Sequence, residues 1–346
     1  MNPFISIVIP TSGRASTLKH VLEGLKRQTY RNFELVLVHK PTSDNTEELL
    51  REYRKILKTK VITQKEGFVT DAYNLGLRQA KGQIIAFLDD DAVPYPNWLE
   101  EHLRIYDFYD HVGGISGPAI SAIEKNGKIV KQVDNSERNY SRVQKPHDFP
   151  WARPVNGMLG YYIFIGRDGL VHHRSELENI DSHSIVPSLL HMGANMSIKK
   201  EALEGLHINN NLILGFAFEQ LLSYQIWKKG YKLLYCPDIK VLHVVHREST
   251  GRFFQSPKRA ALRDAEFILT FAFLRSQERE LSWIAYILGV FALIGRRITR
   301  VNERGLIITL HRIIGLLRGF VIGSAYLISK VIRQSFSIRA ALSKLL

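Results

Sequence analysis

The segment IIAFLDDDAVP, residues 84–94, runs from an apolar strand directly into three consecutive aspartates, Asp89, Asp90 and Asp91. Like charges repel one another and gain nothing from burial in an apolar core. Ligands of open α/β sheets bind beyond the carboxyl ends of the strands, where these acids stand. Because side chains alternate along an extended chain, Asp89 and Asp91 are expected to face one way and Asp90 the other. Such a carboxylate pair predicts an all-oxygen site for Mg²⁺ or Mn²⁺, the alternative being an acidic loop that caps the next helix.

The surrounding sequence alternates between strand-like and helix-like patterns. Leu18, Val21, Leu22 and Leu25 show the i, i+3, i+4, i+7 spacing of a helix, and similar helical segments separate the later apolar runs. This order predicts a Rossmann-like α/β/α sandwich with a mostly parallel central sheet. The strand-like runs are residues 4–10, 33–39, 60–63, 83–88 and 111–120.

Regular patterns return after residues 121–190, which are hard to interpret. Residues 191–203 are expected to form a strand that runs into a helix start, and residues 216–237 a helix, a stop at Gly230 and a strand.

Charge and cysteine content limit where the chain can work. The net charge is +14, and residues 252–346 contain 16 Lys or Arg against 5 Asp or Glu, so +11 of it lies there. The single cysteine, Cys236, excludes an internal disulfide and fits a reducing compartment. The N-terminal apolar run is too short for a signal peptide, so we expect the chain to stay on the cytoplasmic side.

Residues 251–346 form a basic, aliphatic region that is expected to be helical. Its longest uncharged stretch, residues 281–295, is 15 residues long, shorter than the roughly 20 that a spanning helix needs. On a helix through residues 305–320, His311, Arg312, Gly315 and Arg318 share one face and Leu or Ile residues the other. This pattern predicts a helix lying in the membrane interface with its basic face toward anionic headgroups. The alternatives are a helix that packs on the preceding domain and a hydrophobic hairpin that dips into the bilayer.

Several segments, in order, resemble the family 2 glycosyltransferases with the GT-A fold. They are SIVIPTSGRASTLKHVLEGLKRQTYRNFELVLV, SDNTEE, GFVTDAYNLGLRQAKGQIIAFLDDDAVPYPNWLE, GANMSIKKEAL and FEQLLSYQIWKKGYKLLYCPDIKVLH. The resemblance covers roughly residues 4–246, with 121–190 weakly matched. It implies a catalytic domain at 1–250, with a nucleotide-sugar half (1–120) and an acceptor half (121–250), followed by the basic helical region at 251–346.

The resemblance also implies roles for individual residues. Asp89 and Asp91 match the family's Asp-x-Asp motif, which holds a divalent metal, Mn²⁺ or Mg²⁺, and the donor diphosphate. His243 resembles a late histidine that reaches the metal or the diphosphate, although a histidine at a strand end is as often structural. The acceptor or transferred sugar is expected at Asn195, Glu219 and Gln220. The expected nucleotide-sugar site comprises Pro10, Thr11, Arg14, Lys40, Asp71, Asn74, Asp89 and Asp90.

Two departures from the family pattern affect these roles. The acid pair that usually follows the second strand is replaced by His39 and Lys40, so a UDP donor is not implied; Lys40 can approach a base carbonyl or a phosphate instead. Where relatives read Glu-Asp, this chain has Glu219 and Gln220. An amide cannot take up a proton usefully, so Glu219 is the expected general base and Asp91 the other catalytic residue. Alternatively, Glu219 pairs with a nearby lysine.

The expected function is inverting transfer of a sugar from a nucleotide-diphosphate sugar to an acceptor at the cytoplasmic membrane face. A polyprenyl- or dolichyl-phosphate-linked glycan or a lipid phosphate is the expected acceptor, and a polyprenyl-phosphate sugar synthase of the same fold is the alternative. A dehydrogenase is excluded because G-x-G-x-x-G does not follow the first strand, and TSGRAS is a poor match to a nucleotidyltransferase loop. A basic nucleic-acid-binding protein is the alternative from another class, but the basic residues of the tail border aliphatic runs.

Overall fold

The computed structural model describes residues 3–131, 153–174, 184–190, 193–244, 256–275, 277–332 and 335–345. The chain divides into two compact units, each assembled from separate stretches of sequence. Unit 1 consists of residues 1–145, 176–208 and 222–246, and unit 2 of residues 146–175, 209–221 and 247–346. The functional division at residue 250 stays a prediction. The compact units do not follow it, because residues 146–175 and 209–221 precede residue 250 but belong to the same unit as the C-terminal helices.

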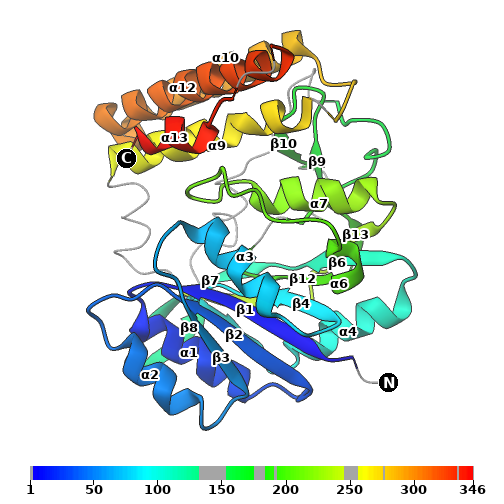
Figure 1. Cartoon of the computed structure of the whole chain (residues 1–346), viewed down its shortest axis with the longest axis vertical. Coiled ribbons are helices and arrows are strands. Elements are labelled where there is room, and N and C mark those ends of the chain that lie inside the picture. Colours follow the sequence, from blue (N-terminus) through cyan, green and yellow to red (C-terminus); the bar gives the residue numbers. More distant parts are fainter. Residues whose placement is uncertain are drawn as a thin grey trace. The chain divides into compact units, whose positions relative to one another are not determined.

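Unit 1 is built on an eight-stranded sheet with the order β11-β13-β6-β12-β4-β1-β2-β3 (Figure 1). The pairs β1–β2, β1–β4, β2–β3 and β6–β13 are parallel, whereas β12 runs antiparallel to both neighbours and β11 to β13. The α/β class with a mostly parallel sheet is therefore confirmed. The strands are β1 (Ile5–Thr11), β2 (Phe33–His39), β3 (Thr59–Thr63), β4 (Ile84–Phe87), β6 (Val112–Ser116), β11 (Val186–Pro187), β12 (Met196–Lys199) and β13 (Lys232–Tyr235).

The helices of unit 1 lie in the segments where the sequence pattern predicts them. Helix α3 packs on β1 and β2. It can approach them closely because Gly76 has no side chain: a Cβ at this position would lie 2.4 Å from Val8 Cγ1. This close packing fixes where the side chains of α3 reach the carboxyl end of β4. The helices are α1 (Ala15–Lys26), α2 (Thr46–Tyr53), α3 (Val69–Gln79), α4 (Trp98–Phe108) and α6 (Lys200–Leu203); α7 (Phe218–Lys228) begins in unit 2 and ends in unit 1.

A second sheet of four strands, in the order β5-β14-β7-β8, corrects one prediction. Residues 111–120, expected as one strand, form β6 in the large sheet and the start of β7 in the second sheet. The break falls at Gly117 and Pro118, where a Cβ on Gly117 would lie 2.0 Å from Ile239 O and proline lacks the N–H that a ladder requires. The strands are β5 (Ala92–Pro94), β7 (Ala119–Lys125), β8 (Lys128–Lys131) and β14 (Val241–Val244).

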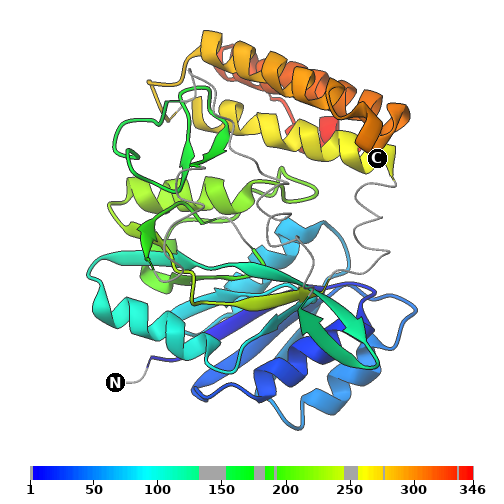
Figure 2. The ribbon, with the colours of Figure 1, turned by 180° about the vertical axis from the view of Figure 1, so that it is seen from behind.

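Unit 2 contains a short antiparallel pair of strands and a group of helices (Figures 1 and 2). Thr270 Oγ1 donates to Gly169 O at 2.7 Å. This bond joins α9, most of whose residues are buried, to the turn between the two strands. The elements are β9 (Ile163–Ile165), β10 (Val171–His173), α9 (Pro257–Arg275), α10 (Trp283–Ile298), α11 (Val301–Arg304), α12 (Leu306–Val331) and α13 (Ile338–Ser343).

Helix α12 packs on α9 through the face that the sequence assigns to lipid headgroups. Arg312 is 1% exposed and donates to both oxygens of Asp264, at 2.7 and 2.9 Å. A Cβ at Gly315 would lie 2.1 Å from Ala261 O, and one at Gly319 2.6 Å from Ala265 O, so the two backbones are in close contact. The predicted basic face is therefore wrong for Arg312 and Gly315, because ion pairing and close backbone packing place them inside the helical group.

The opposite face of α12 exposes apolar side chains, together with the neighbouring face of α10. Phe291 of α10 is 65% exposed, and Leu306, Ile307 and Val321 of α12 are 63–65% exposed. By length and composition α12, which has 26 residues and an 18-residue apolar window with a mean hydropathy of 1.7, is the one helix of the described chain that could cross a bilayer. A third of that apolar window is buried within the protein, as in helices that pack against a core, so this finding is weak evidence for a span.

The close approach of α12 to α9 makes Gly315 sensitive to substitution. We expect Gly315→Ala to lower the free energy of unfolding by about 1–3 kcal/mol, because the added methyl group has to displace backbone of α9. The matched control is Gly295→Ala in α10, where no atom lies within 4 Å of the added methyl and removal of a helical glycine stabilises by up to about 1 kcal/mol. Urea denaturation measures both, and equal effects would contradict close packing at Gly315.

Candidate metal and donor site

Asp89, Asp91 and His243 come together at the carboxyl end of β4. The aspartates follow β4 directly, and β14 pairs antiparallel with β5 so that His243 stands opposite Ala92. The bond from Val244 N to Asp91 O, at 2.8 Å, fixes this register. One ligand atom from each of the three residues lies within 4.8 Å of the others. The structure therefore assembles, from two distant segments, the three side chains predicted to hold a metal.

The donor atoms of this cluster suit a divalent cation. Two carboxylates and an imidazole are ligands that Mn²⁺ and Mg²⁺ sites use, with imidazole favouring the transition metal. Asp91 Oδ1 is buried and has no hydrogen bond of acceptable geometry in the described chain, although His243 Nε2 lies 3.2 Å from it. A buried carboxylate oxygen without a donor is costly, and a cation at this point would satisfy it. The site thus fits a divalent metal.

Arg14 compensates much of the negative charge of the three aspartates. Its Nη1 is 3.3 Å from Asp90 Oδ1 and in direct contact with Asp91 Oδ2. Burial would raise the pKa of Asp91, but His243 and Arg14 hold that pKa at about 2. Burial raises the pKa of Asp90 to about 7 despite Arg14. Burial and the Asp91 charge also raise the pKa of Asp89. Asp91 is accordingly the most firmly ionised of the three.

The imidazole of His243 is affected in the opposite direction. Burial would lower its pKa, but the carboxylates of Asp91 and Asp89 raise that pKa above the ordinary value of histidine. The two carboxylates therefore favour the protonated form of the ring. Metal ligation requires the neutral ring, so binding a cation would displace the proton.

Tyr73 contacts the cluster and was not predicted. Its hydroxyl donates to Asp89 Oδ1 at 2.9 Å from the buried face of α3. The ring packs on Phe87 of β4, with centroids 5.6 Å apart. In the sequence, Tyr73 has only the helical spacing of a core residue, so nothing in the pattern indicated that its hydroxyl contacts Asp89.

The first loop and the loop after β2 are joined beside the aspartates. Asp44 accepts hydrogen bonds from Ala15 N at 2.9 Å and from the Thr46 hydroxyl at 2.9 Å. These bonds hold the start of α1, which follows Arg14, against the start of α2. Lys40 donates to Gly67 O at 3.0 Å and is exposed at the end of β2. Contacts of these loops with a nucleotide stay a prediction.

The remaining first-loop residues lie at the end of β1. Pro10 is half-buried and Thr11 is 4% exposed. The Thr11 hydroxyl lowers the pKa of Asp90, although its oxygen makes no hydrogen bond of acceptable geometry in the described chain.

Asp71 and Asn74, predicted to line the donor pocket, both carry structural bonds on α3. Asp71 Oδ2 accepts from Phe68 N at 2.7 Å and so caps the start of the helix. Asn74 donates to Ile208 O at 2.7 Å and accepts from Ile208 N at 2.9 Å, which fastens a segment 134 residues away. These bonds favour a scaffolding role, and contact with the donor stays a prediction.

Asn195 is fully buried and links three segments. Its Oδ1 accepts from Trp98 Nε1 at 2.7 Å, and its Nδ2 donates to Pro118 O at 2.9 Å and to Ile239 O at 2.7 Å. Both amide hydrogens are used, and the side chain has no exposed surface. The geometry favours a structural role, whereas contact with the sugar or acceptor stays a prediction.

Glu219 and Gln220 lie in the first turn of α7, within unit 2. Glu219 is half-buried and Gln220 is 5% exposed. The loop before them is held by Glu266 of α9, a buried carboxylate that accepts from Ile213 N, Leu214 N and Phe216 N at 2.5, 2.8 and 2.9 Å. These hydrogen bonds could not be predicted from the sequence, because the donors are backbone N–H groups, which every residue except proline has.

The next residue of that loop has an unusual backbone conformation. Ala217 has a φ of 66°, which costs energy for any residue other than glycine. It persists because the neighbouring N–H groups are bonded to Glu266, and it directs the chain into α7.

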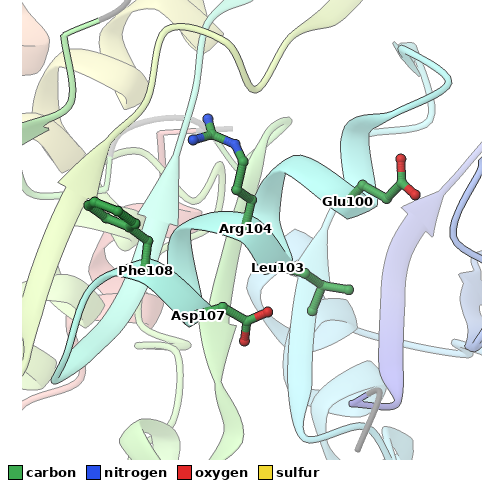
Figure 3. Close-up of a pocket in the computed structure, with 5 residues that line it drawn as sticks. All are labelled: Glu100, Leu103, Arg104, Asp107 and Phe108. Atoms are coloured by element: carbon green, nitrogen blue, oxygen red, sulfur yellow. The ribbon is translucent and has the colours of Figure 1, made fainter.

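A surface depression of about 500 Å³ lies along α4 (Figure 3). All of its lining residues come from this one helix, and none belongs to the Asp–Asp–His cluster, so it lacks polar groups converging from different elements. The lining residues are Glu100, Leu103, Arg104, Asp107 and Phe108.

Comparison with known families places the first half of the chain. The family model described as "Glycosyl transferase family 2" matches residues 6–164, which include the strands around the aspartates. The resemblance drawn from the sequence motifs is thereby confirmed.

Curated relatives are similar over part of their length. The chondroitin synthase of Escherichia coli is 34% identical over 139 residues, which cover 39% of this chain and 18% of the relative. The glycosyltransferase AglE of Haloferax volcanii is 32% identical over 103 residues, covering 28% of this chain and 34% of the relative. The chain thus spans about a fifth to a third of the length of these relatives.

Solved structures share the fold over longer stretches. The mannosyltransferase PcManGT from Pyrobaculum calidifontis, solved with GDP-Man and Mn²⁺, has a TM-score of 0.54 at 15% identity, covering 99% of this chain and 79% of that one. GalNAc-T7, solved with UDP, GalNAc and Mn²⁺, also has a TM-score of 0.54, at 20% identity, covering 78% of this chain and 47% of that one. These similarities confirm the predicted GT-A type of fold.

The Asp–Asp–His cluster predicts that Asp91 is needed for metal binding. We expect Asp91→Asn to weaken Mn²⁺ binding by more than about tenfold, because it removes a charged ligand while keeping its shape. Titration of Mn²⁺ followed by electron paramagnetic resonance measures the affinity, and circular dichroism checks the fold. The control is Asp107→Asn, an exposed acid on α4 outside the cluster. Equal affinities of the two variants for Mn²⁺ would exclude Asp91 as a ligand.

The buried bonds of Asn195 predict a loss of stability. Asn195→Ala leaves the indole N–H of Trp98 and the carbonyl of Ile239 without their Asn195 partner, whereas Pro118 O keeps its bond from Val241 N, so we expect the free energy of unfolding to fall by about 2 kcal/mol. Donor affinity, measured at a temperature where both proteins are folded, should stay within about twofold. A variant with normal stability and weakened donor binding would assign Asn195 to the ligand instead.

Proposed function

We propose that this chain is an inverting glycosyltransferase that moves a sugar from a nucleotide-diphosphate sugar to an acceptor at the cytoplasmic face of the membrane. The observation that supports it is the Asp89–Asp91–His243 cluster at the end of β4, within a family 2 domain. The two structural neighbours were solved with a nucleotide or nucleotide sugar together with Mn²⁺. That pairing favours Mn²⁺ as the metal here, with Mg²⁺ as the alternative.

In this proposal the acidic cluster binds and orients the donor. Asp89, Asp91 and His243 hold the divalent cation, which, when bound, neutralises charge on the departing diphosphate. Tyr73 keeps the Asp89 carboxylate in place by its hydrogen bond. Arg14, which contacts Asp90 and Asp91, would offer its guanidinium to a donor phosphate oxygen if a cation were bound at Asp91.

Glu219 is the proposed general base. It would accept the proton of the attacking hydroxyl. Attack from the side of the sugar opposite the diphosphate would invert the anomeric carbon. Glu266 acts on this step indirectly, because it fixes the loop from which α7 begins.

The proposed acceptor is a polyprenyl- or dolichyl-phosphate-linked glycan or a lipid phosphate. The exposed apolar side chains of α10 and α12 support placement at an anionic membrane surface, with apolar residues rather than a basic face toward the lipid. The same surface speaks against a nucleic-acid-binding protein, which would need aromatic and basic side chains interleaved on a polar surface.

A polyprenyl-phosphate sugar synthase remains the second candidate function. Gln220 stands where relatives carry an aspartate, and a phosphate acceptor, already an anion, needs little help from a base. In that case Glu219 would serve in binding rather than in proton transfer.

The proposal predicts a selective effect of Glu219→Gln. We expect kcat for a hydroxyl acceptor to fall by about 100-fold or more, with donor KM changed less than about twofold, because the amide keeps the shape but takes up no proton. Transfer from GDP and UDP sugars in the presence of Mn²⁺ is the assay, and Glu201→Gln, an exposed acid on α6, is the control.

Two other outcomes are informative. Unchanged turnover of Glu219→Gln with a phosphate acceptor would favour the polyprenyl-phosphate sugar synthase. Wild-type protein that neither binds nor turns over any nucleotide sugar would refute the proposed function as a whole.

A further inference from the structure

Glu266 of α9 is a fully buried carboxylate that is not among the residues predicted from the sequence. It accepts three hydrogen bonds from backbone N–H groups of residues 213–216, the loop that precedes α7. Its Oε1 accepts from Ile213 N and Leu214 N, and its Oε2 accepts from Phe216 N. A buried carboxylate is costly unless its oxygens are hydrogen-bonded, so the side chain and the loop conformation depend on each other.

This set of hydrogen bonds requires a carboxylate at position 266. Both oxygens of an ionised carboxylate accept hydrogen bonds and neither donates, so N–H groups can converge on either oxygen. A glutamine carries an NH₂ group in place of one oxygen, and that group would face at least one of the three loop donors. Residue 266 is therefore suited to anchoring backbone amides, a task that an apolar side chain of similar size could not perform.

The backbone that carries Glu266 is itself held in place. A Cβ at Gly319 of α12 would lie 2.6 Å from Ala265 O, so α12 is in direct contact with α9 beside Glu266. On the other side in sequence, the ring of Phe267 packs on the ring of Phe216 from the loop, with centroids 6.0 Å apart. A carboxylate on such a fixed support can hold the loop in one position.

The anchored loop leads directly into the helix that carries Glu219. One residue, Ala217, separates the last anchored amide, Phe216 N, from the start of α7, and Glu219 is the second residue of that helix. Ala217 has a φ of 66°, which is unfavourable for alanine, and its carbonyl accepts from Leu221 N at 3.1 Å in the first turn of α7. The direction in which α7 begins is therefore set by the loop that Glu266 holds.

We propose that Glu266 is a positioning residue for Glu219, because it fixes the loop from which α7 begins and so sets where the Glu219 carboxylate lies. The inference rests on the proposed function, in which Glu219 accepts the proton of the attacking hydroxyl. A base must lie within hydrogen-bond reach of that proton, and a displacement of about 1 Å can cost about 100-fold in rate. A helix beyond residues 6–164, the segment that the family model matches, would thereby be needed for transfer.

The test combines Glu266→Gln with Glu219→Gln in the transfer assay with a hydroxyl acceptor. Glu266→Gln alone should lower kcat by about tenfold or more and change donor KM by less than about twofold, because it displaces the base and not the donor. In the Glu219→Gln background the same substitution should lower kcat by less than about twofold, since no base is left to displace. Losses that multiply would show that Glu266 does not act through Glu219, and would overturn the proposal.

Asp168→Asn is the matched control, because Asp168 is another fully buried carboxylate of unit 2. It accepts from Leu170 N at 3.1 Å and lies 2.9 Å from His172 Nε2, so these bonds stay within residues 168–172. Both variants should lower Tm. Only Glu266→Gln should lower kcat and speed deuterium exchange at the amides of residues 213–216 by about tenfold. Equal losses of kcat in the two variants would indicate a general loss of structure and would overturn the proposal.

Ala217→Gly provides a second variant in case Glu266→Gln does not fold. Glycine adopts a φ of 66° without strain, so Tm should stay equal or rise. The same substitution loosens the one residue between the anchored amides and α7, so we expect kcat to fall by about threefold or more although stability does not fall. Unchanged kcat in Ala217→Gly, with Glu266→Gln either unfolded or unchanged in kcat, would overturn the proposal.

The outcomes also separate this inference from the proposed function. A loss of kcat in Glu219→Gln without one in Glu266→Gln would remove the positioning role alone and leave the base assignment intact. Unchanged kcat of Glu219→Gln for a hydroxyl acceptor would show that the base assignment is wrong, and its positioning by Glu266 would fall with it.

Discussion

The repulsion among three consecutive carboxylates is the constraint around which unit 1 is organised. Half-buried Asp89 and buried Asp90 and Asp91 stand at the end of a fully buried strand, where water screens their charges poorly. The fold brings in one guanidinium from the loop after β1 and one imidazole from β14, over 150 residues later in sequence. Strand order and register thus make the ion pairing possible, because both β1 and β14 have to reach this edge of the sheet for Arg14 and His243 to contact Asp91.

The sequence was sufficient to predict the strands and helices of this arrangement but not the side-chain hydrogen bonds that connect them. Strand and helix positions follow from periodicity, and the metal triad followed from the Asp-x-Asp resemblance with one distant histidine. What periodicity does not reveal is the partner of a buried polar side chain. Asn74 and Asn195 were assigned to ligands because polar residues in those segments line sites in relatives, yet their hydrogen-bond partners in the structure are mostly backbone groups of distant segments. Backbone carbonyls are present at every position, so no sequence pattern distinguishes the one that is used.

The orientation of α12 was inaccessible for a related reason. Its amphipathic pattern is real, but a pattern with arginines on one face does not say which face is inside. The answer depends on Asp264, which lies 48 residues earlier and can neutralise Arg312, and on glycines that let two backbones touch. Once these contacts form, the aliphatic side is left outward, the reverse of what charge alone suggests.

The hydrogen bonds between Glu266 and the backbone of residues 213–216 have a practical consequence for truncation experiments. A gene shortened at residue 251 would encode the whole glycosyl transferase family 2 match, yet it would lack α9 and would leave three backbone amides and a left-handed alanine without their anchor. Loss of turnover in such a fragment would say nothing about lipid, because the helix that bears the proposed base would no longer have a defined beginning.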